Sequence, residues 1–342
     1  MMTLIAQKQF LDDLYICDNN DSNTKDFSSF LKTDFFGYNL VCDFKDINEY
    51  LEASKLNPFW ELLMDKYDNI FFNSKLNEEI QMDEFYENLG EQNIFLIDNG
   101  SDICDRMMSE RGYIFLSIDN ISTKWEKFRK CNEGIHLKIT NSNIIPEEQK
   151  LNSWEKISDY CFPINNAIIF DRYLLKNKTD QKLENNLFPF LSKLSQKNTT
   201  KKPLKITLIT EFEDYECIKV SYSKIENFLT DNNYNNIIFN IVKHVKALYP
   251  RNFEGLHSRF ILTNYFHFRC DDSFNYFKRN GKINNDADLR ISFNLSSKHK
   301  HFFEKELTDI KMYLEKIINN PDNPSQNLKI LYLKDKSNSL LN

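Results

Sequence analysis

Short apolar runs alternate with longer stretches of mixed polarity along most of this chain. In the first 150 residues the apolar runs are rich in β-branched and aromatic residues and lie at 39–43, 69–72, 93–97 and 113–118. Helical patterns separate them, at 47–67 and 101–111. Strands buried on both faces of a parallel sheet are continuous apolar runs, and parallel neighbours need a crossover that is usually a helix. The alternation therefore predicts an α/β layer with a mostly parallel sheet.

A polar stretch at 146–150, Pro-Glu-Glu-Gln-Lys, is the expected domain boundary. The same alternation continues beyond it. Strands are expected at 167–175, 204–210, 237–242 and 287–293, and helices at 182–198, 221–230 and 301–318. We therefore expect two α/β domains, residues 1–145 and 151–342, with mixed or mostly parallel sheets flanked by helices.

Charge is distributed unevenly between these two parts. The chain has a net charge of −6, yet residues 1–150 hold 15 Lys and Arg against 28 Asp and Glu, a net −13. The remainder holds 29 against 22, a net +7. Clustered cations lower the cost of approaching phosphates, so the basic part is expected to bind a polyanion. The alternative, that its lysines only solvate the surface, stays open.

Composition indicates an ordered globular protein. With 29 Phe and 16 Tyr but only 7 Gly and 8 Pro, large side chains for a core are abundant and linker-forming residues are scarce. No window approaches the roughly 20 apolar residues that span a bilayer. Seven scattered cysteines without a Cys-x2-Cys pair predict reduced thiols rather than disulfides or a zinc site. We expect a soluble, cytoplasmic protein with no membrane partner.

The second half contains two copies of one short pattern, with an arginine, a leucine and an asparagine at matching positions. The copies are Phe170-x-Arg172-x4-Asn177 and His257-x-Arg259-x4-Asn264. Residues two apart in a strand point the same way, so the first and third residues of each copy are expected to project together. Two such strands related by a pseudo-twofold axis would place Arg172 and Arg259 in one cleft.

This spacing resembles the signature of the phospholipase D superfamily, His-x-Lys-x4-Asp, whose two copies meet at one site within an α/β fold. The resemblance covers residues 160–300 and implies a phospholipase D-like C-terminal half. In that family one histidine attacks phosphorus, the other protonates the leaving group, the lysines hold phosphate oxygens and the acids orient the site. The corresponding pairs here are Phe170 and His257, Arg172 and Arg259, and Asn177 and Asn264.

These replacements predict binding without turnover. A covalent phosphohistidine route needs a nucleophile and a separate proton donor, and Phe170 can be neither. His257 is the one candidate catalytic residue that remains. Arginine keeps a permanent charge and offers a planar fork that suits two phosphate oxygens, so the phosphate-binding candidates are Arg172 and Arg259 together with Asn177 and Asn264.

Two kinds of nuclease remain as alternatives. One would use His257 with Arg172 and Arg259. The other would use Asp43, Asp98 and Asp119, which lie at or just beyond the ends of expected strands, where an α/β sheet gathers ligand-binding residues. Three carboxylates there could hold Mg²⁺ in the manner of PIN-like nucleases, although aspartate is also common as a helix cap and turn residue.

The sequence thus favours a non-catalytic phospholipase D-like protein that binds a phosphate-bearing ligand, with nucleic acid as the expected ligand. No resident metal or cofactor is expected. We expect a recognition or scaffold subunit of a bacterial or mobile-element complex, antiviral defence included, whose acidic N-terminal half contacts a protein partner. The third alternative is an interaction subunit with no phosphate ligand.

Overall fold

A computed structural model describes most of the chain, and its described residues form two compact units. The described residues are 2–17, 22–35, 37–87, 89–175, 181–197, 202–212, 215–243, 259–270, 273–318, 330–331, 338 and 340–341. The first unit comprises residues 1–133 with 293–300, and the second comprises residues 134–292 with 301–342. The sequence gives the first unit 15 Lys and Arg against 26 Asp and Glu, and the second 29 against 24. The second unit is therefore the basic one.

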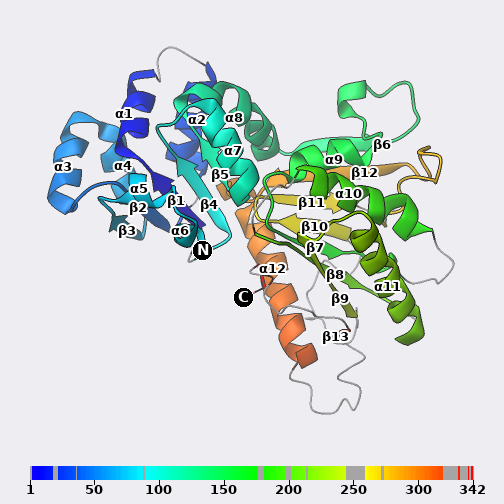
Figure 1. Ribbon diagram of the computed structural model, residues 1–342. Coiled ribbons are helices and arrows are strands. Elements are labelled where there is room, and N and C mark those ends of the chain that lie inside the picture. The colour runs from blue at the N-terminus through cyan, green and yellow to red at the C-terminus, as the bar shows by residue number, and fades with distance from the viewer. Residues whose placement is uncertain are drawn as a thin grey trace. The chain divides into compact units, whose positions relative to one another are not determined.

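The first unit is built on a five-stranded parallel sheet with the order β3-β2-β1-β4-β5. Its strands are β1 (Met2–Ala6), β2 (Asn39–Cys42), β3 (Asn69–Phe72), β4 (Gln92–Leu96) and β5 (Ile114–Leu116). Its helices are α1 (Lys8–Cys17), α2 (Ser22–Ser29), η1 (Phe30–Asp34), α3 (Ile47–Leu56), α4 (Pro58–Lys66), α5 (Leu76–Glu79), α6 (Asp83–Glu87), α7 (Ser101–Arg111) and α8 (Ile118–Glu133). Figure 1 shows this alternation of strands and helices.

One helix expected in this unit is divided in two. The pattern at 47–67 predicts a single helix, whereas α3 ends at Leu56 and α4 begins at Pro58. Proline has no backbone N–H and clashes with the preceding turn, so it is favoured at the first position of a helix. Asn57 caps α4, since its side-chain oxygen accepts a hydrogen bond of 3.0 Å from the Phe59 N–H.

The second unit is built on an eight-stranded mixed sheet with the order β13-β9-β8-β7-β10-β11-β12-β6. Strands β7, β8 and β9 are parallel, and β10 runs antiparallel between β7 and β11. The strands are β6 (Ile135–Ile139), β7 (Asn166–Phe170), β8 (Leu204–Thr210), β9 (Ile237–Lys243), β10 (Arg259–Thr263), β11 (Phe266–Cys270), β12 (Ala287–Phe293) and β13 (Ile330–Leu331). The helices are η2 (Glu147–Gln149), α9 (Trp154–Cys161), η3 (Leu183–Leu187), α10 (Phe188–Lys197), α11 (Tyr215–Asp231) and α12 (Ser297–Ile318).

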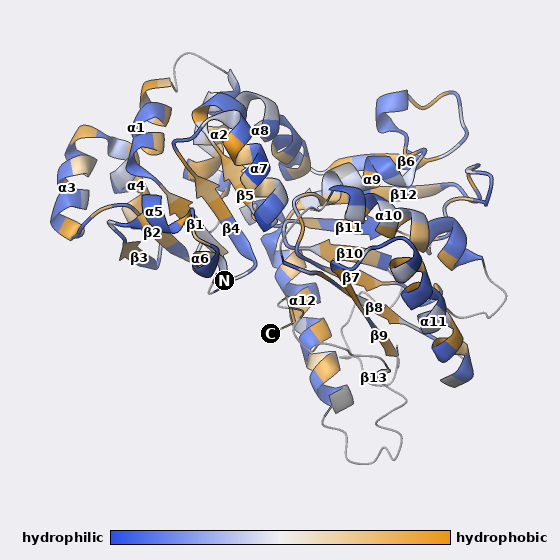
Figure 2. Ribbon diagram, in the orientation of Figure 1, coloured by the Kyte–Doolittle hydropathy of each residue, from blue (hydrophilic) through white to orange (hydrophobic). Residues whose placement is uncertain are grey.

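The expected α/β class, with parallel and mixed sheets flanked by helices, is confirmed. The boundary expected at 146–150 falls inside the second unit, because β6 at 135–139 pairs antiparallel with β12. The central strands of the second unit are almost wholly apolar and are orange in Figure 2. Among the helices of the described residues, none is long and apolar enough to cross a membrane.

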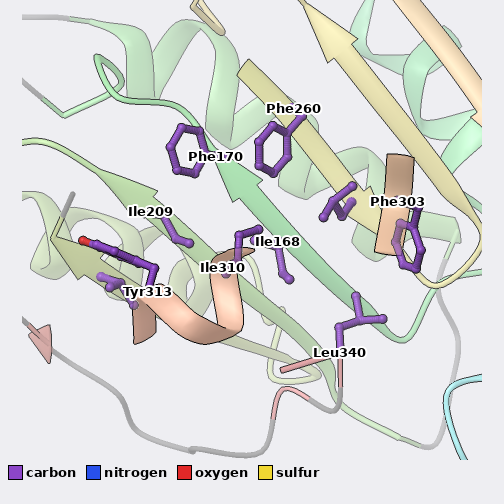
Figure 3. Close-up of a cluster of buried hydrophobic side chains, with 10 residues drawn as sticks. Ile168, Phe170, Ile209, Phe260, Phe303, Ile310, Tyr313 and Leu340 are labelled. Carbon is purple, nitrogen blue, oxygen red and sulfur yellow. The ribbon is translucent and has the colours of Figure 1, made fainter. Parts of the chain in front are cut away.

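Alternating side chains place α12 against one face of the second sheet. Phe170 and Phe260 pack there with Phe303, Ile310 and Tyr313 of α12 (Figure 3). Leu262 belongs to the same buried cluster. Consecutive parallel strands linked by right-handed crossovers place their helices on a common face, and α10 and α11 therefore cover the other one (Figure 1). Both faces of the central strands are buried, which explains their continuous apolar runs.

Candidate phosphate-binding site

Both motif arginines lie at one edge of the second sheet. Strands β7 and β10 are antiparallel neighbours in which Phe170 pairs with Phe260, so the end of β7 lies beside the start of β10. Arg259 is the first residue of β10, and Arg172 lies two residues beyond the last residue of β7. This is also the edge at which the parallel strands β7, β8 and β9 end, the usual place for ligands in α/β sheets.

Strand β7 is shorter than the sequence predicts. The expected strand at 167–175 ends at Phe170, because the Asp171 carboxylate accepts a hydrogen bond of 2.9 Å from the Tyr173 N–H and bends the chain into a turn. The Arg172 carbonyl nevertheless accepts a hydrogen bond of 3.0 Å from the Glu211 N–H, so the turn stays beside the end of β8. The expectation that Phe170 and Arg172 share a strand and project together is therefore wrong.

The two guanidinium groups gather around one aromatic ring. The Arg172 Cζ lies 5.3 Å from the centroid of the Tyr173 ring, and the Arg259 Cζ lies 5.0 Å from the same centroid. Their separation therefore cannot exceed about 10 Å, the sum of these two distances. Within this upper limit, both guanidinium groups can contact the same ligand.

Glu211 holds Arg172 in place and occupies only part of the set of N–H donors on the guanidinium group. Its Nε donates to Glu211 Oε1 at 2.5 Å, and both side chains are about one quarter exposed, at 23% and 22%. An arginine has five N–H donors in a planar fork. Within the described residues, no acceptor contacts the two Nη groups of Arg172. Glu211 therefore orients the guanidinium and leaves its outer edge available to an anion.

A lysine adds a third positive charge near this edge. Lys182 Nζ donates a hydrogen bond of 3.0 Å to the Tyr173 carbonyl. Two arginines and a lysine thus lie within contact of the 172–173 turn, and Glu211 and the buried Asp171 are the acidic side chains placed beside them in the part of the chain that the structure describes. Three cationic side chains gathered at one turn are the kind of group that can hold an anionic ligand.

Asp171 is a structural carboxylate beneath this site. It is wholly buried and accepts hydrogen bonds from the Ser273 hydroxyl at 2.8 Å and the Phe274 N–H at 2.6 Å. Burial raises the pKa of Asp171, and the hydrogen bonds from Phe274, Tyr173 and Ser273 oppose that rise. Asp171 therefore joins the arginine-bearing turn to the segment that follows β11.

Replacing Asp171 by alanine is expected to lower the free energy of unfolding by about 2 kcal/mol at neutral pH, because two buried donors and the part-buried Tyr173 N–H lose their acceptor. Urea unfolding followed by circular dichroism measures this. Asp288→Ala, which removes a half-exposed carboxylate paired with Lys138, is the control and should cost less than about 1 kcal/mol. Equal losses in both variants would contradict the role given to Asp171.

The difference in free energy of unfolding between the wild type and Asp171→Ala is expected to depend on pH. An acid whose pKa is raised by folding takes up its proton more readily in the folded state, so its contribution to stability increases as the pH falls through the raised value toward 3.8. The stability gap between the wild type and Asp171→Ala should therefore widen on acidification.

The remaining motif residues lie apart from the arginines or outside the described residues. Phe170 is wholly buried on the α12 face, stacked on Phe260 at 4.9 Å between ring centroids. Asn264 follows the far end of β10 and is also wholly buried; its Oδ1 accepts the N–H groups of Asn165 and Asn166 at 2.8 and 2.9 Å. It therefore fixes the start of β7. His257 and Asn177 lie outside the described residues.

The candidate metal ligands Asp43, Asp98 and Asp119 are not grouped into a metal site. Asp98 and Asp119 line one cavity of about 460 Å³ together with Asp13. Asp43 instead accepts a 2.5 Å hydrogen bond from the Lys8 N–H, and burial raises the pKa of its carboxyl. Across the described ranges, no three His, Cys, Asp or Glu side chains are grouped so that they could hold a metal ion.

Three residues of the site were missed by the sequence interpretation. The sequence pattern assigns Tyr173 to a strand, whereas the position of its ring depends on the turn at Asp171. Glu211 is the first residue after an expected strand, a position at which ligand-binding residues gather, and that signal could have found it. Lys182 has no distinguishing pattern.

Comparisons with known proteins add little to this picture. No protein-family model matches the chain, and no curated protein matches it. Among solved structures, the chain is similar to the crystal structure of phosphatidylserine synthase from Haemophilus influenzae Rd KW20, with 10% sequence identity and a TM-score of 0.29. The alignment covers 58% of this chain and 39% of the synthase chain. A likeness this remote carries no argument about what the chain binds or catalyses.

Proposed function

We propose that the second unit binds a phosphate-bearing ligand between Arg172 and Arg259. The observation that carries this proposal is the contact of both guanidinium groups with the single ring of Tyr173. Glu211 offsets part of the charge of Arg172, and the outer edge of that guanidinium still offers donors beside Arg259. Charge-assisted, bidentate hydrogen bonds from arginine to phosphate are among the strongest that proteins make.

Nucleic acid is the ligand we favour. The unit that carries the arginine pair has an excess of positive charge, 29 Lys and Arg against 24 Asp and Glu, which suits a ligand with a row of phosphates. Tyr173 supplies an aromatic group at the same position, and aromatic rings beside a basic groove are common in proteins that bind single strands.

In this proposal the site binds without cleaving. Phe170 occupies the position of one of the two histidines in the phospholipase D pattern, and its ring is packed into the core. The site would then have no second histidine for acid–base work at that position. The protein would serve as a recognition or scaffold subunit in a bacterial or mobile-element complex, antiviral defence included, with the acidic first unit available to a protein partner.

The test is fluorescence anisotropy of labelled single- and double-stranded DNA and RNA at a series of salt concentrations. Each neutralised phosphate releases counterions, so log affinity should fall linearly with log salt, with a slope of about −2 or steeper. Absent binding, or binding that does not respond to salt, would contradict the proposal and favour a pure interaction subunit.

The same oligonucleotides distinguish binding from cleavage. They are incubated with the protein in Mg²⁺ or in EDTA and separated by electrophoresis. Intact strands in both conditions are expected. Cleavage that is lost in His257→Ala would show a nuclease at the phospholipase D-like site, and Mg²⁺-dependent cleavage that is lost in Asp98→Ala would show one in the first unit.

A further inference from the structure

A groove in the second unit begins beside the turn that carries Arg172. It consists of two cavities, of about 840 and 320 Å³, that share part of their walls. The residues common to both cavities are Gln181, Asn185, Phe277, Lys278 and Arg279. Volumes of this size are typical of sites that hold several chemical groups of a ligand. The groove therefore has room for more than a single phosphate group.

Two connections place the groove next to the arginine pair. Lys182 donates a hydrogen bond of 3.0 Å to a carbonyl of the arginine-bearing turn, and the preceding residue, Gln181, lines both cavities. The Asp171 carboxylate accepts a hydrogen bond of 2.6 Å from the Phe274 N–H, and the next residue, Asn275, lines the smaller cavity. A ligand longer than one phosphate would therefore extend from the arginine pair into the groove.

The two walls of the groove are joined to each other. The buried Asn186 of η3 donates to the Phe277 carbonyl at 3.2 Å and accepts from the Phe277 N–H at 2.9 Å. The turn beyond Phe277 closes through a hydrogen bond of 2.9 Å from the Gly281 N–H to the Lys278 carbonyl, and Gly281 has a φ of +74° that suits glycine. A groove that is already formed costs a ligand little ordering of the protein.

Side-chain amides line this groove. Gln181 is exposed, and Asn185 and Asn275 are half-buried. None of these amides makes a side-chain hydrogen bond within the described residues. An amide presents a donor beside an acceptor, which is the pattern that pairs with the edge of a nucleic-acid base. Proteins that recognise single strands hydrogen-bond to such exposed base edges.

The charges of the groove leave a positive excess. The larger cavity contains two ion pairs whose charges balance, at 3.3 Å for Lys193 with Glu155 and at 2.9 Å for Lys224 with Glu184. Lys278 and Arg279 are exposed and have no carboxylate partner in the part of the chain that the structure describes. Two exposed cations would define no site by themselves. Here they lie in the same wall as the amides, beside the arginine pair, where a strand would present further phosphates.

We infer that a single strand of nucleic acid held at the arginine pair continues through this groove. The inference rests on the proposed function and extends it. Phosphates beyond the first pair with Lys278 and Arg279, and base edges hydrogen-bond to the amides of Gln181, Asn185 and Asn275. A duplex keeps its bases paired and stacked, so the groove favours a single strand over a duplex.

Fluorescence anisotropy of the full chain with a labelled 5′-phosphorylated trinucleotide and a labelled single-stranded decanucleotide tests this inference. The decanucleotide should bind more tightly, because only the longer strand fills the groove. Lys278→Ala with Arg279→Ala should weaken decanucleotide binding about tenfold and leave trinucleotide binding unchanged. Asn185→Ala with Asn275→Ala, which changes no charge, should weaken decanucleotide binding about fivefold.

A control variant and the short strand separate the groove from the arginine pair. Arg290→Ala with Lys316→Ala removes two exposed cations that line neither cavity, and should reduce decanucleotide affinity less than about threefold. Circular dichroism of each variant excludes loss of the fold. Equal affinities for the two strands, or equal losses in the groove and control variants, would overturn the groove and leave the proposed function standing. Absent binding of both strands would overturn the inference and the proposed function together.

Discussion

Replacing Phe260 by alanine is expected to lower the free energy of unfolding of the second unit by about 4 kcal/mol. Phe260 is wholly buried in β10, where its ring stacks on Phe170 with planes 11° apart and meets the edge of the His267 ring at 6.0 Å. Strand β10 pairs on both sides, with β7 and β11, so the surrounding sheet cannot collapse into the space that the ring leaves. The loss therefore combines lost apolar burial with a cavity.

Urea unfolding monitored by circular dichroism and tryptophan fluorescence measures this loss. Phe302→Ala is the matched control: it removes the same side chain from α12, where Phe302 is 51% exposed, and should change stability by no more than about 0.5 kcal/mol. Phe260→Leu keeps most of the volume and should cost about 1 kcal/mol. If Phe260→Ala is no more destabilising than Phe302→Ala, the placement of β10 at the centre of the core is wrong.

Replacing Arg172 and Arg259 together by alanine is expected to weaken binding of a single-stranded oligonucleotide about a hundredfold. Each guanidinium supplies charge-assisted hydrogen bonds, and either single variant should lose about tenfold. Arg172→Ala also removes the 2.5 Å partner of Glu211, so less of the positive charge beside that carboxyl group would remain to attract the phosphate. The slope of log affinity against log salt should become shallower by about two in the double variant.

The control for this experiment removes the same charge elsewhere on the second unit. Arg290→Ala with Lys316→Ala replaces two exposed cations of β12 and α12 and should reduce affinity less than about threefold. Circular dichroism of each variant excludes loss of the fold. Equal losses of affinity in the two double variants would mean that binding reflects only net charge. That result would contradict a binding site at the arginine pair.

The fold was largely predictable because its strands are buried on both faces. Continuous apolar runs such as 204–210 and 237–242 mark strands whatever their neighbours, and they correspond to β8 and β9. Strands β1, β6 and the two-residue β13 were missed. β1 is a five-residue run at the start of the chain, and β6 has the short alternating pattern of a strand with one exposed face, which is easily taken for a loop.

The site was predictable only in part, because its geometry depends on contacts distant in sequence. The repeated spacing identified Arg172 and Arg259, which the structure brings to one ring. The position of Arg172 depends on a turn fixed by Asp171, whose carboxylate binds Ser273, about 100 residues away along the chain. The motif placed Asn264 among the phosphate-binding candidates. Its side-chain oxygen instead accepts two backbone N–H groups inside the fold.

In the proposed site, one ligand phosphate lies between Arg172 and Arg259. A crystal structure of the full chain with a short single-stranded oligonucleotide tests it most directly. A phosphate within about 3 Å of guanidinium nitrogens of both Arg172 and Arg259, beside Tyr173, is the predicted result. An oligonucleotide bound elsewhere, with no phosphate contacting either arginine, would contradict the proposed site.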